Sequence, residues 1–163
     1  MPNPKGLIPN PPLDYAIDWL SALLLVVSWS YLLFNYAEIP VTIPTHYNFE
    51  GVADGFGEKS QLIVLLGIGT AIYVGLYILN FFSHRRNFIA SITEENAFYH
   101  YSTAKNMLRM VNLPLAITFS YLGSKAVHNA LNGATDLDAW MSPVILVLLF
   151  VPLTYYLFKL AKK

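Results

Sequence analysis

Residues 60–83 read SQLIVLLGIGTAIYVGLYILNFFS, and this stretch decides the fold class of the 163-residue chain. It contains no aspartate, glutamate, lysine or arginine, and it is longer than the about 20 residues that a helix needs to cross about 30 Å of hydrocarbon. A strand with open edges would leave unpaired backbone groups in lipid, at several kcal/mol each. The stretch therefore predicts a transmembrane α-helix.

Three further segments on either side of this run are also long and apolar. Residues 19–37 and 139–158 are uncharged. Residues 111–131 carry one charge, on Lys125, whose ammonium group can reach the interface from the last third of a span. We therefore predict an all-α integral membrane fold, formed by one domain over the whole chain. Its four transmembrane helices are expected at about 16–37, 60–83, 110–131 and 140–159.

The composition agrees with lipid as the main partner. Hydrophobic residues make up 55% of the chain and charged residues 12%, about half of the roughly 25% found in soluble domains. Ten basic and ten acidic side chains cancel, so the chain lacks the basic footprint of a nucleic-acid-binding protein. Without cysteine, disulfides and zinc–thiolate sites are excluded.

The distribution of lysine and arginine predicts the orientation, because basic residues are retained in the cytoplasm. If both termini are cytoplasmic, the outer side holds only two basic residues, Lys59 and Lys125. The cytoplasmic set is Lys5, Arg85, Arg86, Lys105, Arg109, Lys159, Lys162 and Lys163. A signal peptide is the alternative for the amino-terminal run, although Asp14 and Asp18 stand where basic residues would be expected.

Residues 86–109 are too polar to cross the membrane and too long for a simple turn. Their apolar residues have helical spacing, which favours an amphipathic helix in the cytoplasmic interface over a solvated connector. Within the second predicted span, Gly67, Ala71 and Gly75 are four residues apart. They therefore share one face, where small side chains predict close packing of a neighbouring helix.

The segment between the first two predicted spans, residues 38–59, reads EIPVTIPTHYNFEGVADGFGEK. Its prolines favour an extended backbone, because each proline fixes its own φ and disfavours helix in the preceding residue. Gly51, Gly55 and Gly57 provide turn positions. We therefore expect a structured, non-helical extracellular loop.

His46, Glu50 and Asp54 are spaced four apart, which on a helix would align three metal ligands. The glycines oppose such a helix, so we predict neither a metal nor a cofactor, with His46 hydrogen-bonded to backbone or to a carboxylate. Two alternatives stay open. The loop could bring these residues together with Asn48, or they could form a composite site with His128.

A binding function fits the loop best. Aromatic Tyr47, Phe49 and Phe56 lie near acidic residues, a composition suited to a cationic amphipathic peptide. The acidic residues are Glu38, Glu50, Asp54 and Glu58. No HExxH or GxSxG motif occurs, so the sequence predicts no catalytic residues. A small-solute or proton-coupled transporter subunit and a membrane-embedded metal-dependent enzyme are the alternatives, and a homo-oligomer stays open.

The loop also resembles a known family. The motifs are residues 43–48 (IPTHYN), Gly51, 54–57 (DGFG) and 59–60 (KS). They resemble the loop of a bacterial membrane domain of unknown function, which is similar to the amino-terminal part of SdpI-type immunity proteins. The resemblance implies a multi-pass inner-membrane protein that binds a peptide or a cytoplasmic partner protein. With the acidic residues of the loop, it gives the predicted ligand-binding residues His46, Tyr47, Asn48, Glu50, Asp54 and Lys59.

Overall fold

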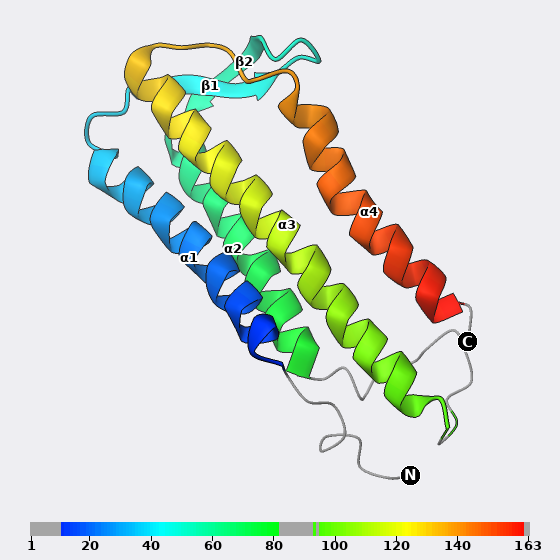
Figure 1. The fold of residues 1–163 in the computed structure, drawn as a ribbon. Coiled ribbons are helices and arrows are strands. Elements are labelled where there is room, and N and C mark those ends of the chain that lie inside the picture. The colour runs from blue at the N-terminus through cyan, green and yellow to red at the C-terminus, as the bar shows by residue number, and fades with distance from the viewer. Residues whose placement is uncertain (1–10, 82–92, 94, 162–163) are drawn as a thin grey trace.

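The protein is a bundle of four antiparallel helices with a β-hairpin at one end (Figure 1). The computed structural model describes residues 11–81, 93 and 95–161. The elements are α1 (Pro12–Asn35), β1 (Thr42–Tyr47), β2 (Ala53–Glu58), α2 (Ser60–Phe81), α3 (Ala97–Asn132) and α4 (Met141–Ala161). We call the end that carries β1 and β2 the hairpin end, and the opposite end, where α1 begins and α4 ends, the terminal end (Figure 1).

Three helices have the length and composition of membrane spans: α1, α2 and α4. None of the described side chains of α4 is buried, and few of those in the apolar windows of α1 and α2 are. Side chains this apolar would be unfavourable in water over such an area, whereas hydrocarbon is a suitable solvent for them. The chain is therefore a membrane protein with at least three apolar helices that lipid can surround.

Helix α3 differs from the other three in both composition and position. It packs against α1, α2 and α4, whereas α1 and α2 touch each other much less. Its buried residues include many polar side chains, among them Arg109, Asn112, Thr118, Ser120 and Asn129. Polar groups in a membrane protein normally face the bundle interior because exposure to hydrocarbon is costly. The central position of α3 therefore explains how the bundle contains a polar helix.

Side-chain hydrogen bonds join the helices along their length. The hydroxyl of Ser28 in α1 donates to the carbonyl oxygen of Ser120 in α3 at 3.0 Å, and lies 3.0 Å from the hydroxyl oxygen of Ser124. The indole nitrogen of Trp29 donates to Thr70 Oγ1 of α2 at 2.9 Å. Such bonds contribute to association where lipid removes the hydrophobic driving force between helices. They fix α1 against both α2 and α3.

A buried ion-pair cluster joins α1 to α3 toward the terminal end. Nε and Nη2 of Arg109 each donate to a different oxygen of Asp18 at 2.9 Å, and Nη1 donates to Asp14 Oδ2 at 2.6 Å. The Arg109 side chain is 4% exposed, and those of Asp14 and Asp18 are 12% and 14% exposed. The two carboxylates, one turn apart on α1, hold the guanidinium from one side in paired geometry.

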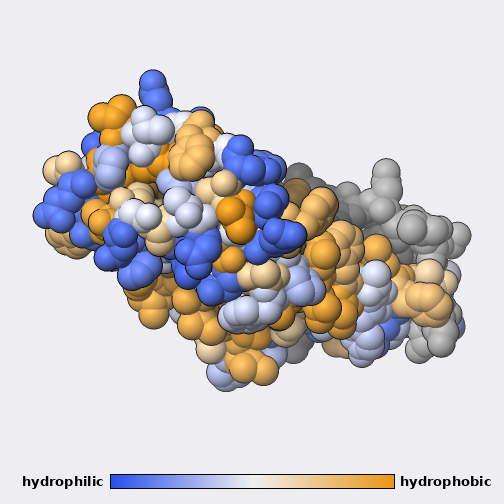
Figure 2. Space-filling view, turned by 90° about the horizontal axis from the view of Figure 1, so that it is seen from above, coloured by the Kyte–Doolittle hydropathy of each residue, from blue (hydrophilic) through white to orange (hydrophobic). Residues whose placement is uncertain are grey.

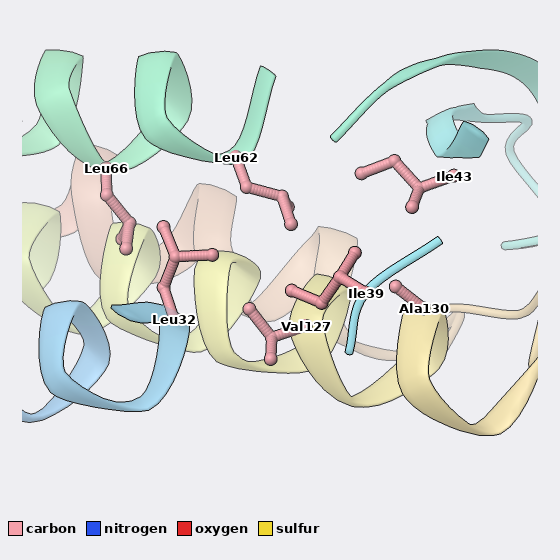
Figure 3. Packing of buried hydrophobic residues seen from close by; sticks show 7 residues of the cluster. All are labelled: Leu32, Ile39, Ile43, Leu62, Leu66, Val127 and Ala130. Atoms are coloured by element: carbon pink, nitrogen blue, oxygen red, sulfur yellow. The ribbon is translucent and has the colours of Figure 1, made fainter. Parts of the chain in front are cut away.

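At the hairpin end, apolar side chains from α1, the connection after it, β1, α2 and α3 form a common core (Figure 3). Leu32 of α1, Ile43 of β1 and Leu66 of α2 are at most 1% exposed, and Val127 of α3 is fully buried. Ile39, Leu62 and Ala130 complete the cluster. The hairpin is thus packed onto the helices through Ile43 rather than projecting from them.

The structure corrects three of the sequence predictions. Residues 97–109 do not form a separate interfacial helix, because they continue without a break into residues 110–132 of α3. Residues 97–113 contain no proline or glycine, so nothing in the local sequence ends the helix near residue 109. Residues 86–92, the first part of the predicted interfacial helix, lie outside the described residues.

The second correction concerns helix boundaries. Helix α1 begins at Pro12 rather than near residue 16, since proline is well accommodated in the first turn of a helix. Helix α4 covers Met141–Ala161, close to the predicted 140–159, and α2 begins at the predicted Ser60.

The third correction concerns the small residues of α2. A Cβ added to Gly67 or Gly75 would meet no described atom within 4 Å, and Ala71 is exposed. The close approach instead occurs at Gly69, against the Phe119 ring, and at Gly123 of α3, against Leu66. The predicted packing face therefore points away from α3, because the contact face of α2 is set by the neighbouring α3 rather than by the spacing of small residues alone.

The ion-pair cluster generates a stability prediction. We expect Arg109→Gln to lower the free energy of unfolding by about 3–5 kcal/mol, because it leaves two carboxylates buried without their partner. Thermal unfolding of the purified protein in detergent measures the effect. The exposed Asn106→Ala, on the same helix, is the control. Adding Asp14→Asn and Asp18→Asn to Arg109→Gln should recover part of the loss. An Arg109→Gln variant as stable as wild type would contradict a buried, paired guanidinium.

Candidate functional site

The loop predicted to be structured and non-helical forms an antiparallel hairpin. Thr42 pairs with Glu58, Ile43 with Gly57 and Pro44 with Phe56, and the register shifts on either side of His46. Along β2, burial alternates between partly buried and exposed residues. Asp54, Phe56 and Glu58 therefore share the outward face of this strand, while Gly55 and Gly57 face inward.

Glycine allows a close approach at both inward positions. A Cβ on Gly55 would lie 2.8 Å from the Cβ of His46, and one on Gly57 would lie 2.6 Å from the side-chain nitrogen of Gln61, which would have to move. The DGFG motif thus allows β2 to lie close to β1 and to the start of α2.

A network of hydrogen bonds shapes the tip of the hairpin. The side-chain oxygen of Asn48 accepts hydrogen bonds from the backbone N–H groups of Glu50 at 2.9 Å and Val52 at 3.0 Å. Gly51 has a φ of 82°, in the left-handed region that glycine tolerates best. Asn48 therefore shapes the turn through its own side chain, which is a structural role for one of the predicted ligand-binding residues.

The tip of the hairpin is joined to the connection between α3 and α4. The N–H of Ala53 donates to the carbonyl of Thr135 at 2.8 Å, and the N–H of Leu137 donates to that of Gly51 at 2.7 Å. Asn129 of α3 also donates through its side-chain nitrogen to the Asp136 carbonyl at 2.7 Å. These bonds hold the hairpin over the ends of α3 and α4.

Asp138 anchors the same connection to α3. The Tyr121 hydroxyl donates to Asp138 Oδ2 at 2.7 Å, and Lys125 Nζ lies 3.3 Å from that oxygen. The Tyr121 hydrogen bond, followed by the Lys125 ammonium, holds the pKa of Asp138 below its usual value. The carboxylate is therefore ionised at neutral pH. Lys125, which was expected to reach the interface, pairs there with this carboxylate.

Lys59 fastens the base of the hairpin to the end of α1. Its ammonium donates to the carbonyl oxygens of Tyr36 at 2.9 Å and Ile39 at 3.0 Å, and lies 4.7 Å from the centre of the Tyr36 ring. Two hydrogen bonds and one cation–π contact thus hold the ammonium against the residues that directly follow α1. The structure thus gives Lys59 a structural position, at the base of the hairpin rather than in its exposed face.

His46 and Asp54 form an exposed pair on the hairpin. His46 Nδ1 lies 2.5 Å from Asp54 Oδ1, and their side chains are 74% and 48% exposed. This contact agrees with the interpretation of His46 as hydrogen-bonded to a carboxylate. His128 contacts Asn132 instead. Within the described residues, no three histidine or acidic side chains are placed to hold a metal ion, so neither arrangement proposed for a metal is assembled.

The outward face of the hairpin combines aromatic and acidic side chains. Phe49, at the tip, is fully exposed and Phe56 is 60% exposed. Glu50, Asp54 and Glu58 are exposed beside them. Seen from the hairpin end, hydrophilic and hydrophobic residues lie side by side on this surface (Figure 2). We call the surface formed by Phe49, Glu50, Asp54, Phe56 and Glu58 the outer face.

A cavity of about 490 Å³ lies between β1, α2 and α3, and none of the five outer-face residues lines it. The hairpin contributes three of the predicted ligand-binding residues to its lining: His46, Tyr47 and Asn48. The walls come mainly from Leu62, Leu65 and Ile68 of α2 and from Leu122 and Ala126 of α3. Glu50, Asp54 and Lys59 are not in this lining. The structure therefore places three of the predicted residues at the cavity, Glu50 and Asp54 on the outer face, and Lys59 at the base of the hairpin.

Sequence reasoning missed the helical walls of this cavity and the Asp14–Asp18–Arg109 cluster. The wall residues are ordinary leucines and alanines inside apolar runs, which give no local signal. The cluster had a signal, because Asp14 and Asp18 are one turn apart at the start of an apolar run. Nothing local indicated Arg109 as their partner.

The hairpin, with the adjoining halves of α1 and α2, is similar to a known domain. Residues 23–70 match DUF1648, a domain of unknown function. The DUF1648 region therefore contains the second half of α1, both strands and the first half of α2. It includes the outer face, whereas the α3 side of the cavity lies beyond it.

One relative carries a similar segment. Over 62 residues, the chain is 32% identical to an uncharacterized protein of Archaeoglobus fulgidus. The match covers 37% of this chain and 34% of that protein. No solved structure matches the chain.

The geometry of Gly51 generates a prediction about the hairpin. We expect Gly51→Ala to loosen the hairpin tip, because φ is positive there and the added Cβ would collide with the Leu137 carbonyl oxygen. Gly133→Ala is the matched control, with a positive φ of 64° but no described atom within 4 Å of the added Cβ. Both variants should lower the free energy of unfolding by about 1–2 kcal/mol, because alanine is disfavoured at a positive φ.

Hydrogen exchange of the Ala53 and Leu137 amides distinguishes the two variants. Gly51→Ala should lose protection at both amides, whereas Gly133→Ala should retain it. Equal protection in both variants would show that the tip does not depend on the close contact between Gly51 and Leu137.

Proposed function

We propose that the chain is a four-span membrane protein whose hairpin faces the outside of the cell and binds a cationic amphipathic peptide or a partner protein. The fourth span in this proposal is α3, whose polar side chains are covered by the other three helices. The orientation rests on the excess of lysine and arginine assigned to the terminal end.

One observation carries the binding proposal: an anchored hairpin exposes two phenylalanines among carboxylates. Phe49 and Phe56 would each release free energy when a partner covers them, about 1.5–3 kcal/mol for a fully buried side chain. The surrounding carboxylates would attract a positively charged partner. Because the hairpin is held by α1, α2 and the α3–α4 connection, little ordering cost would oppose binding.

The resemblance of residues 43–60 to the loop of SdpI-type immunity proteins supports the same class of ligand. In this proposal, binding at the outer face either removes a membrane-active peptide or signals its presence. Transfer of a signal to a cytoplasmic partner would require the helices to respond, since all four labelled helices connect the hairpin end to the terminal end (Figure 1).

A binding experiment tests the outer face directly. The probe is a fluorescein-labelled amphipathic peptide of lysine and leucine, added to the protein in lipid nanodiscs. We expect the combined variant Phe49→Ser and Phe56→Ser to bind at least about tenfold more weakly, a loss of about 1.4 kcal/mol. Glu50→Gln with Asp54→Asn should reduce the salt dependence of binding, because fewer charges attract the peptide.

Phe98→Ser is the matched control, since Phe98 is an exposed aromatic residue near the start of α3. It should bind the peptide as wild type does. Binding by the wild-type protein that does not exceed binding by empty nanodiscs would remove the peptide proposal.

Cysteine labelling in intact cells tests the orientation. The chain has no cysteine, so in a single-cysteine variant only the introduced residue can react with the label. We expect Glu50→Cys to react with a membrane-impermeant maleimide, and Glu95→Cys to react only after the membrane is permeabilised, because the basic residues place the terminal end inside. Both positions are exposed. The reverse pattern would place the hairpin in the cytoplasm.

A further inference from the structure

The cavity beneath the hairpin is continuous with the surface that α2 presents to lipid. Val64 and Ile68 line the cavity, yet they are 57% and 50% exposed. Leu62, deeper in the same wall, is 3% exposed. Ser142, near the start of α4, contributes the opposite rim. A molecule in the bilayer could therefore enter sideways between α2 and α4 without passing through water.

The lining has the chemistry of a site for a hydrocarbon chain with one polar end. Its helical walls are aliphatic, and its polar members are concentrated near the hairpin and the rim, including Gln61, Asn48 and Ser142. Tyr47 also lines the cavity, and its hydroxyl is buried without a hydrogen-bond partner in the described part of the chain. The volume falls within the roughly 300–1,000 Å³ typical of small-molecule sites.

The residues of the lining also indicate which kind of polar head group the ligand can carry. Among the described lining residues, none is aspartate, glutamate, lysine or arginine, and the ring of His46 is already paired with Asp54. A charged head group would lose hydration here without gaining a counter-ion. A peptide segment would bring many backbone donors and acceptors that aliphatic walls could not satisfy. An uncharged head group with a single hydroxyl avoids both costs.

We propose that this cavity binds the hydrocarbon chain of a neutral, single-chain amphiphile, such as a long-chain alcohol, taken from the leaflet at the hairpin end. The chain lies against Leu65 and Leu122, and the hydroxyl lies near Tyr47, Gln61 and Ser142. His46 of the lining contacts Asp54, but none of the five outer-face residues lines this site. It therefore does not depend on peptide binding, and variants can remove the two activities separately.

Photolabelling of the full chain in phosphatidylcholine nanodiscs tests the proposal. The probe is hexadecanol with a photoactivatable diazirine in its chain, followed by mass spectrometric mapping of the labelled peptides. We expect saturable labelling of the peptides that contain Leu65 and Leu122. Unlabelled hexadecanol should compete, whereas palmitate should compete at least about tenfold less well because of its charge.

Two substitutions should reduce the saturable labelling at least about tenfold. Ala126→Trp fills the cavity, and Ser142→Trp obstructs the rim at an exposed position where misfolding is not expected. Val147→Trp, on the exposed surface of α4, is the control and should leave labelling unchanged. Each variant is checked by thermal unfolding before labelling.

Three results would overturn the proposal. One is labelling that is not saturable and is equally strong on exposed residues of α4. Another is palmitate competing as well as hexadecanol, which would exclude a preference for a neutral head group. The third is unchanged labelling in a folded Ser142→Trp variant. None of these results would contradict the proposal that the outer face binds a cationic peptide, because that proposal rests on other residues.

Discussion

The structure depends on the packing of three apolar helices around one polar helix, which keeps the polar side chains away from lipid. Helix α3 carries a buried arginine and many buried hydroxyl and amide groups, which hydrocarbon would solvate poorly. Packing against α1, α2 and α4 removes them from lipid. The same arrangement leaves the apolar surfaces of α1, α2 and α4 facing outward. The surrounding lipid therefore explains the arrangement, in which the most polar helix lies at the centre of the bundle.

The hairpin depends on that central helix as well. Ile43 packs with Val127 and Ala130 of α3, and the hairpin tip shares hydrogen bonds with the connection that follows α3. Lys59 then fastens the base of the hairpin to the end of α1. The hairpin is consequently fastened to the bundle at its core, its tip and its base. Its outer face exposes aromatic and acidic groups, and β1 lines part of an aliphatic cavity.

Local sequence signals predicted much of this fold. Long uncharged runs identified α1, α2 and α4, and the prolines and glycines of residues 38–59 excluded a helix between the first two. They did not predict the pairing of the two strands, because the register of β1 against β2 depends on the packing of Ile43 against the helices. The polar stretch before residue 110 was interpreted as a separate helix. In the structure, α1 and α4 are available to contact it, so it continues α3.

The sequence by itself indicated a membrane environment and located the three apolar helices α1, α2 and α4, since length, hydropathy and chain-breaking residues act over a few turns. Tertiary structure alone decided which groups meet. Arg109 pairs with carboxylates 91 and 95 positions away, and the cavity draws on three helices and the hairpin. Such contacts depend on how helices rotate and tilt against one another, and residues distant in the chain carry no local record of that geometry.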